Sequence, residues 1–238
     1  MIHFKVPDNA VKYILFQRAG YLVFNNNKIL NKLFYSNSIF PYEKALIFES
    51  VIFKNRIKNM FINDMLKEYK NIENSLPKNA KSILDVGCGV AGIDVFISNH
   101  YKNNNINFYL LDKSKIDKKV YYNFNLKGSF YNSLSASKSL LVNNGIKPNN
   151  IKLQEVNENC VILFKQKFDL VISLISWGYH YPVTTYLNQV YDLMNINGVL
   201  IIDIRKGTGG EKYIYDKFLN MKIILESDKY IRIKSIRN

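Results

Sequence analysis

One stretch of the sequence, LDVGCGVAGIDVF, combines glycines and acids in a spacing that could bind a ligand. Gly87, Gly89 and Gly92 follow the G-x-G-x-x-G pattern, after an apolar run and before a helical pattern. Glycines at this spacing permit a tight turn, a close approach of ligand to backbone, and access to the free N–H groups of a helix end. Asp112 follows twenty residues after Gly92, where its carboxylate could accept both hydroxyls of a ribose. The pattern predicts a site for a ribose-bearing ligand.

Asp85 helps to discriminate between ribose-bearing ligands. It precedes Gly87 by two residues, so its carboxylate lies beside the path of the ligand. A negative charge is poorly placed for the pyrophosphate of a dinucleotide, which would sit on the helix end. The same charge suits a positively charged sulfonium with an amino-acid tail. A nicotinamide-dependent oxidoreductase remains an alternative, because the glycines and Asp112 satisfy its fingerprint too.

A second stretch, SWGYHYP (176–182), places an imidazole among large aromatic rings directly after an apolar run. A neutral histidine near pH 7 can accept the proton of a hydroxyl group. We expect His180 to be a general base, with the pocket walled by Trp177, Tyr179 and Tyr181. Two alternatives stay open: His180 binds substrate without moving a proton, or the aromatic cluster only packs the core.

A third stretch, DIRKGTGGEKY, carries two adjacent basic residues followed by a glycine-rich loop. The guanidinium fork of Arg205 binds two oxygens of a phosphate or carboxylate. We expect Arg205 and Lys206 to bind an anionic acceptor. The alternative is an ordinary solvated basic turn.

Short apolar runs that alternate with helical patterns must position these stretches. Runs at 82–86, 106–112, 151–156, 168–174 and 198–204 read as strands, with helices near 92–101, 131–143 and 184–194 between them. Such runs indicate a parallel sheet covered by helices on both faces. The runs 221–227 and 229–236 predict an antiparallel hairpin at its edge. Ligands of such sheets bind beyond the carboxyl ends of the strands, where all three stretches begin.

The first 79 residues are expected to form a helical extension or cap, distinct from a domain at 80–238. Apolar residues recur at helical spacing over 42–70, which predicts one amphipathic helix. Its apolar positions are Ile47, Val51, Ile57, Phe61, Met65 and Tyr69. This helix caps the site or forms a dimer interface, so that a monomer and a homodimer are both open.

Residues 80–238 resemble the class I S-adenosylmethionine (SAM)-dependent methyltransferases. The family's first motif matches LDVGCGVAG, its second LLD with Asp112, and its fourth FDLVISL. The predicted C-terminal hairpin agrees with the family's three-layer, Rossmann-like, seven-stranded sheet, whose last strand is antiparallel. The resemblance implies SAM as cofactor and S-adenosylhomocysteine as product.

The resemblance also implies roles for individual residues. Asp85 and the backbone of Gly87, Cys88 and Gly89 would hold the methionine part of the cofactor, with Cys88 as a small residue rather than a catalytic thiol. Asp112 would bind the ribose, and the adenine would lie near Asn157 or Glu158. Ser173 would lie near the transferred methyl group.

The expected activity is O-methylation of a small polar acceptor, sugar-type or phosphorylated, as in glycan biosynthesis. Ser173 replaces the acid or amide that amino-methylating families often carry at that position. The net charge of +14 favours RNA methylation as an alternative. However, only five residues are arginine and the lysines are scattered, so nucleic acid is the weaker expectation. A binding module without catalysis is a further alternative.

Other features of the composition exclude or favour broad classes. Two cysteines are too few for a disulfide framework, and metal-ligand spacings are not evident. No apolar run reaches the 18 or so residues that span a bilayer, and the first residues lack a signal-peptide pattern. We therefore expect a metal-independent, cytoplasmic enzyme without a membrane span.

Overall fold

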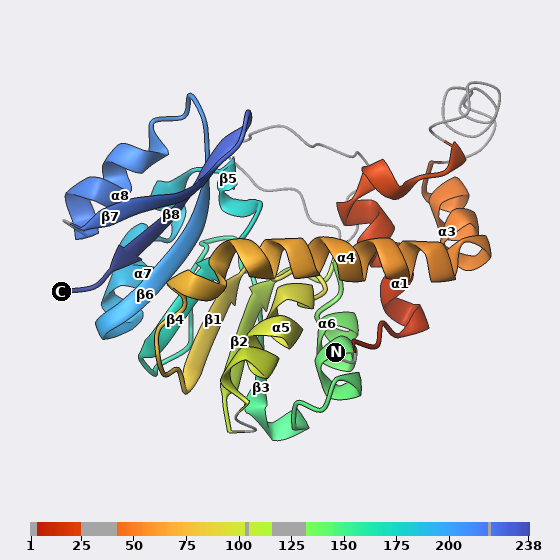
Figure 1. The fold of residues 1–238 in the computed structure, drawn as a ribbon, viewed down its shortest axis with the longest axis horizontal. Helices are drawn as coiled ribbons and strands as arrows, with labels where there is room; N and C mark the ends of the chain where they lie inside the picture. Colours follow the sequence, from red (N-terminus) through yellow and green to blue (C-terminus); the bar gives the residue numbers. More distant parts are fainter. Residues whose placement is uncertain (1–3, 25–41, 103–104, 116–131, 219) are drawn as a thin grey trace.

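The computed structural model describes residues 4–24, 42–102, 105–115, 132–218 and 220–238. One mixed sheet has the strand order β3-β2-β1-β4-β6-β8-β7 (Figure 1). β8 runs antiparallel to β6 and β7, whereas β3, β2, β1, β4 and β6 pair in parallel. This confirms the expected α/β fold with its C-terminal hairpin. The strands are β1 (Ser82–Val86), β2 (Asn107–Asp112), β3 (Ile151–Glu155), β4 (Phe168–Ser173), β6 (Met194–Arg205), β7 (Met221–Glu226) and β8 (Tyr230–Ile236).

The strands divide the core into two apolar layers. Ile83 and Leu84 are neighbours in β1 and both are fully buried, but they belong to opposite layers. Successive side chains of a strand point to opposite faces, so a strand covered on both faces is apolar throughout. One layer holds α5 (Gly92–Tyr101) and α6 (Leu134–Asn143), and the other holds α7 (Leu187–Leu193) and α8 (Gly210–Phe218).

The single helix expected over 42–70 is wrong. The chain forms α3 (Tyr42–Ile52) and α4 (Lys54–Ile72), separated by Phe53 with φ −102° and ψ 21°. Residues spaced regularly across this break no longer share one face. α4 keeps its apolar face and buries Phe61 and Met65 near α5, whereas Val51 of α3 is 66% exposed.

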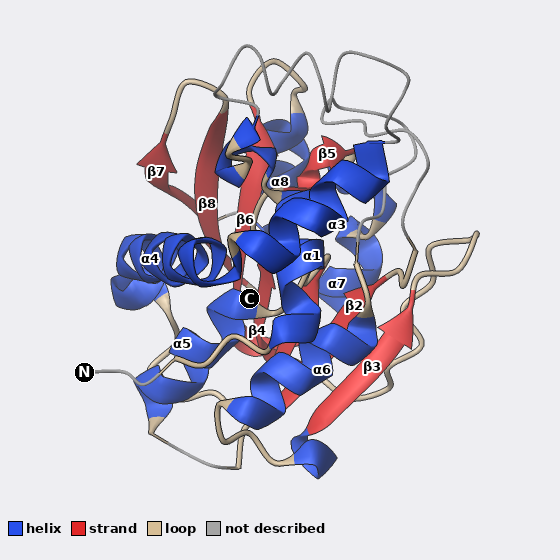
Figure 2. Ribbon diagram, turned by 90° about the vertical axis from the view of Figure 1, so that its right-hand side faces the viewer, coloured by secondary structure: helices blue, strands red, loops and turns tan. Residues whose placement is uncertain are grey.

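The N-terminal helices share a core layer with the sheet. α1 (Asp8–Gln17) buries Ile14 and Leu15 completely, in the same layer as α5 and α6. Figure 2 shows α1 beside α6, and α4 crosses in front of the sheet in Figure 1. The expected helical extension is therefore present. A domain boundary near residue 80 stays a prediction.

The aromatic stretch is itself a short strand, β5 (Ser176–Tyr181), which packs against β6 outside the seven-stranded sheet. Gly178 has φ +84°, and a Cβ at this position would lie 2.8 Å from the carbonyl oxygen of Asp203. Only glycine fits such a close approach in the left-handed region. Gly178 thus brings β5 against β6 and fixes which of its side chains face the carboxyl ends of β1 and β4.

Candidate functional site

The glycine loop leaves β1 in a conformation that other residues would not tolerate. Gly87 has φ +74°, and its N–H donates to the carbonyl of Leu111 at 2.7 Å. A Cβ on Gly87 would lie 1.7 Å from Ser176 Oγ, and one on Gly89 would lie 2.7 Å from Gln17 Oε1. The approach of β5 therefore requires glycine at position 87, whereas the end of the Gln17 side chain could move aside for a Cβ at position 89.

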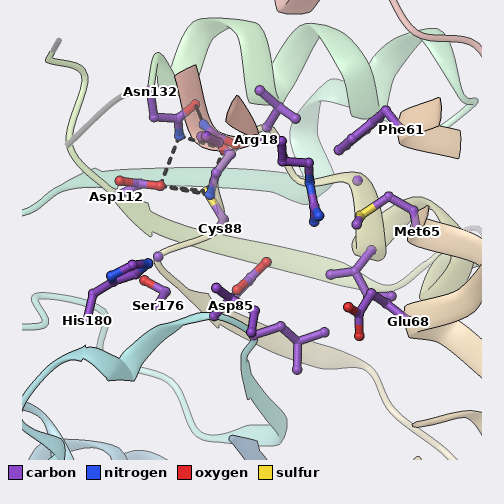
Figure 3. A pocket seen from close by; sticks show the side chains of 18 of the residues that line it. Arg18, Phe61, Met65, Glu68, Asp85, Cys88, Asp112, Asn132, Ser176 and His180 are labelled. Atoms are coloured by element: carbon purple, nitrogen blue, oxygen red, sulfur yellow. Dashed lines mark hydrogen bonds between the residues drawn. The ribbon is translucent and has the colours of Figure 1, made fainter. Parts of the chain in front are cut away.

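A cavity opens beside this loop, and Figure 3 shows its lining side chains. Its volume is about 210 Å³. The glycine loop and the end of β2 form one side, the turn from β4 to β5 forms another, and α1 and α4 close it. Of the residues expected from the sequence, the cavity is lined by Asp85, Gly87, Cys88, Gly89, Asp112, His180 and Tyr181.

Asp112 is held in place by donors from three segments. Its Oδ2 accepts the N–H of Gly89 at 2.8 Å and the amide of Asn132 at 3.0 Å, and its Oδ1 accepts the N–H of Lys113 at 2.7 Å. Burial raises the pKa of Asp112 from 3.8 to about 6, although these donors act in the opposite direction. The carboxylate is thus ordered at the cavity wall before any ligand binds (Figure 3).

Two further carboxyl groups are buried behind the loop. Asp85 at the end of β1 is 3% exposed, and Asp94 in the first turn of α5 is fully buried. Desolvation raises the pKa of both groups, and the proximity of Asp94 raises that of Asp85 further. The side chains of Asp85 and Asp94 lie within hydrogen-bonding reach of each other. Burial of acids without cationic partners makes this side of the cavity favourable for positive charge.

Cys88 lies in the same loop but does not resemble a nucleophile. Its side chain is buried, and burial raises the pKa of the thiol well above its ordinary value, as does the nearby Asp112. A reactive cysteine needs the opposite shift. The Cys88 Sγ–H points to the carbonyl of Gly89 at 3.3 Å. This geometry suits a small residue accommodated in the turn.

The side chains of β5 divide between the cavity and the core. Ser176 and His180 line the cavity, as does Tyr181 at the end of the strand. Trp177 is fully buried and donates from Nε1 to the carbonyl of Val183 at 2.8 Å. Tyr179 is buried with its ring edge-on to that of His180, at 4.8 Å between centroids. Strand alternation explains why Ser176 and His180 line the cavity whereas Trp177 and Tyr179 do not.

The remaining residues expected from the sequence do not line the cavity. Ser173 is fully buried and donates to the carbonyl of Val86 at 2.8 Å. Asn157 and Glu158 are exposed after β3, next to Val156, which lines the cavity.

The basic residues at the end of β6 also lie outside the lining. Arg205 stacks its guanidinium over Tyr179 at 5.0 Å. Lys206 is exposed and pairs with Glu226 at 2.7 Å. The two adjacent residues thus have different surroundings.

The structure adds residues that sequence reasoning missed. Three of them, Phe61, Met65 and Glu68, share one face of α4 at helical spacing, and this spacing was the available signal. Arg18 and Gln17 come from the end of α1, and Asn132 binds the Gly89 carbonyl at 2.5 Å. These three carry no local pattern that marks a site.

The described residues do not form a recognisable metal site or membrane span. Among the described residues, there is no group of three or more His, Cys, Asp or Glu side chains placed to bind a metal ion. No helix in the described ranges is both long enough and apolar enough to cross a bilayer.

Comparisons with known proteins give structural similarities only. No family model and no curated protein matches the sequence. A 16S rRNA N2 G1207 methyltransferase of T. Thermophilus, solved with AdoMet and guanosine, is 10% identical with a TM-score of 0.48. The alignment covers 74% of this chain and 42% of that one, so this chain spans less than half the length of the enzyme.

Two further structures are O-methyltransferases. An O-methyltransferase family protein from Burkholderia thailandensis is 10% identical with a TM-score of 0.48, over 77% of this chain and 60% of that one. The O-methyltransferase TomG from Streptomyces achromogenes, in complex with SAM, is 8% identical with a TM-score of 0.45, over 76% and 80%.

Proposed function

We propose that this chain is a SAM-dependent methyltransferase that methylates a hydroxyl group of a small polar acceptor. The observation that carries the proposal is the convergence of Asp85, Asp112 and His180 on one cavity at the carboxyl ends of parallel strands. Bound SAM supplies a methyl group on a positively charged sulfur. In this proposal, Asp112 binds the ribose, and Asp85 with the glycine loop holds the amino-acid end.

The residues present fit this cofactor. The loop glycines leave backbone exposed, and Asp112 is already oriented by Gly89 and Asn132. A carboxylate offers about four acceptor sites, and the donors from Gly89, Asn132 and Lys113 occupy three, so Asp112 keeps capacity for a hydroxyl donor. A cationic ligand beside Asp85 would offset the desolvation that raises its pKa. The adenine would pass Val156 and approach Asn157 or Glu158.

The same charges argue against a dinucleotide. A pyrophosphate would lie at the N-terminus of α5, where its charge normally meets only N–H donors. Here Asp94 lies in that first turn and Asp85 lies beside the loop, both fully or almost fully buried. The carboxyl group of Asp85 lines the cavity and would face the negatively charged ligand. We therefore propose SAM rather than a nicotinamide cofactor.

His180 would take the proton that a hydroxyl acceptor loses during methylation. Its imidazole lines the cavity, and the Tyr179 ring packs edge-on against it and limits its orientation. Ser176 and Tyr181 lie on the same wall. In the proposed site these three side chains contact the acceptor. Trp177 and Tyr179 support this wall from behind.

Arg205 would bind an anionic group on the acceptor. Its Nη1 is buried and has no hydrogen-bond partner among the described residues. The Tyr179 ring contacts both Arg205 and His180, at 5.0 Å from the guanidinium and 4.8 Å from the imidazole. Lys206 is not part of this proposal, because Glu226 already pairs with it.

Isothermal titration with S-adenosylhomocysteine, and separately with NAD, tests the cofactor. We expect the wild type to bind S-adenosylhomocysteine and not NAD. The variant Asp112→Asn should bind S-adenosylhomocysteine about 10–100 times more weakly, because a charged acceptor is lost. The exposed Asp216→Asn on α8 is the control and should match the wild type. Binding of NAD alone would establish the oxidoreductase alternative instead.

Transfer of a labelled methyl group from SAM to a panel of sugars and sugar phosphates tests the acceptor class. Once an acceptor is found, His180→Ala should lower kcat by about 10²–10⁴, the usual contribution of a general base. Its affinity for S-adenosylhomocysteine should remain. Turnover with an unchanged pH profile would remove His180 from the mechanism.

RNA methylation is the second candidate, favoured by the net charge of +14. Binding to a structured RNA at several salt concentrations separates the two. Affinity that falls steeply with salt would support an RNA substrate, because released counterions drive such binding. Absence of binding at low salt would eliminate it.

A further inference from the structure

A fully buried arginine joins three distant segments next to the cavity. Arg232 on β8 is 0% exposed, and its Nε and Nη2 donate to Asp203 of β6 at 2.7 and 2.9 Å. Its Nη1 forms an ion pair with Glu68 of α4 at 2.7 Å. The same guanidinium thus connects the C-terminal hairpin to the N-terminal extension.

These three residues leave one negative charge in excess. Arg232 carries one positive charge, whereas Asp203 and Glu68 each carry one negative charge. Asp203 is fully buried, and its Oδ2 also accepts the N–H of Ile175 at 3.0 Å. Glu68 alone of the three lines the cavity, and its side chain is 20% exposed. The excess charge therefore faces the cavity, where a cationic ligand group would compensate it.

A second arginine near this wall, Arg18 at the end of α1, is paired with a different acidic residue. Arg18 also lines the cavity, but its guanidinium lies over the Phe61 ring at 5.8 Å and pairs with Asp64 at 3.9 Å. Asp64 lies on α4, one turn before Glu68. Asp64 also pairs with Lys67 at 3.7 Å, so Arg18 and Lys67 are both engaged by Asp64, and Arg232 is the cation paired with Glu68.

The location of Glu68 matches one end of the proposed cofactor. In the view of Figure 3, Asp85 lies between Asp112 and Glu68. A ligand with its ribose at Asp112 that extends past Asp85 would bring its far end to the α4 wall. In SAM and S-adenosylhomocysteine, that far end is an amino acid with a protonated amine.

We propose that Glu68 binds the α-ammonium group of the cofactor and that Arg232 is a positioning residue, which holds the Glu68 carboxylate toward the cavity. This inference rests on the proposed function and deepens it. The helical extension then belongs to the cofactor site rather than only covering the acceptor. Arg232 itself does not touch the ligand.

Titration with two probes tests the role of Glu68: S-adenosylhomocysteine, and 5′-methylthioadenosine, which lacks the amino acid. Glu68→Gln should weaken binding of S-adenosylhomocysteine by about 10–100-fold, because a hydrogen bond between charged groups is lost. Binding of 5′-methylthioadenosine should change less than about twofold. Thermal stability should not fall, because the substitution removes the excess charge. Glu73→Gln, just after α4 and paired with Lys70, is the matched control.

The outcomes separate this inference from the proposed function. If the wild type binds neither probe, the proposed function fails. If the wild type binds both and Glu68→Gln binds S-adenosylhomocysteine normally, only the role of Glu68 is wrong. Equal weakening of both probes would mean that Glu68 merely supports the fold, which also overturns the inference.

A double-mutant cycle tests the positioning role of Arg232. Arg232→Lys keeps the positive charge but loses the guanidinium fork that spans Asp203 and Glu68. We expect about tenfold weaker binding of S-adenosylhomocysteine and unchanged binding of 5′-methylthioadenosine. Adding Arg232→Lys to Glu68→Gln should then cause little further loss, because both act through one carboxylate. Fully additive losses, or equal losses for both probes, would contradict the positioning role.

Discussion

Two walls of the cavity are built in different ways. The wall formed by the glycine loop and the end of β2 places Asp85, Gly89 and Asp112 within one β-α-β unit. The opposite wall takes Arg18 from α1 and Glu68 from α4, and Arg232 of β8 fixes the latter. The first wall is local in sequence, whereas the second exists only because three distant segments fold together.

The walls also differ in how their charges are balanced. Asp85 is buried in the first wall and Asp94 behind it, and desolvation raises the pKa of both. On the second wall, each acidic group has a guanidinium nearby, as in Glu68 with Arg232. A cationic ligand would therefore stabilise the first wall more than the second. On the second wall, loss of an arginine would leave the carboxylate without a fixed orientation. Substitutions can test each half of this comparison.

The largest effect is expected where β5 approaches the glycine loop of the first wall. Gly87→Ala should destabilise the fold by about 2–4 kcal/mol, because the new Cβ needs φ +74° and lies 1.7 Å from Ser176 Oγ. Gly145→Ala is the matched control, since φ is +88° but no atom lies within 4 Å of its Cβ. Chemical denaturation measures both. Equal losses would mean that backbone conformation, and not the close approach of β5, requires Gly87.

The next effect concerns the pH dependence of ligand binding. Burial raises the pKa of Asp112 to about 6, so its carboxyl group is increasingly protonated below that pH. Affinity for S-adenosylhomocysteine should thus rise about tenfold per pH unit at most as pH increases from 5 to 6, and level off above 7. Asp112→Asn should abolish this part of the dependence. A wild-type affinity that is constant over this range would contradict the assignment.

A smaller effect is expected from removing a buried charge of the first wall. A carboxyl group whose pKa is raised on folding binds more protons in the folded state, so its contribution to stability is lost as pH rises from 3.8 through the folded pKa. Asp94→Asn should therefore stabilise the ligand-free protein at pH 8 by about 1 kcal/mol, or about 2–4 °C in Tm. The exposed Asp216→Asn should leave Tm unchanged. A lower Tm for Asp94→Asn would show that the carboxylate is stabilising.

The smallest effect provides a baseline away from both walls. Lys206 and Glu226 form an exposed ion pair, and such pairs contribute about 0–1 kcal/mol. Lys206→Ala should change neither the free energy of unfolding by more than about 0.5 kcal/mol nor the affinity for S-adenosylhomocysteine. Thermal denaturation and titration measure the two quantities. A loss of affinity would place Lys206 in the site and reinstate the expectation from the sequence.

The sequence by itself determined the features that depend on neighbouring residues. The apolar runs of β1, β4 and β6 indicated a parallel sheet, because a strand buried on both faces does not alternate between apolar and polar residues. The position of Asp112 followed from the same logic, since the carboxyl ends of adjacent parallel strands meet at one edge. Gly87 and Gly89 could be assigned to a tight turn from their spacing alone.

Only the tertiary structure decided which distant residues meet at the cavity. No local pattern shows that Phe53 ends a helix, or that Trp177 points away from the cavity while His180 lines it. The orientation of Trp177 and His180 follows from Gly178, which brings β5 against Asp203 of β6. Arg232 reaches Glu68 only because β8 inserts beside β6 and α4 crosses the sheet. Such contacts join residues far apart in the chain, and no periodicity in the sequence encodes them.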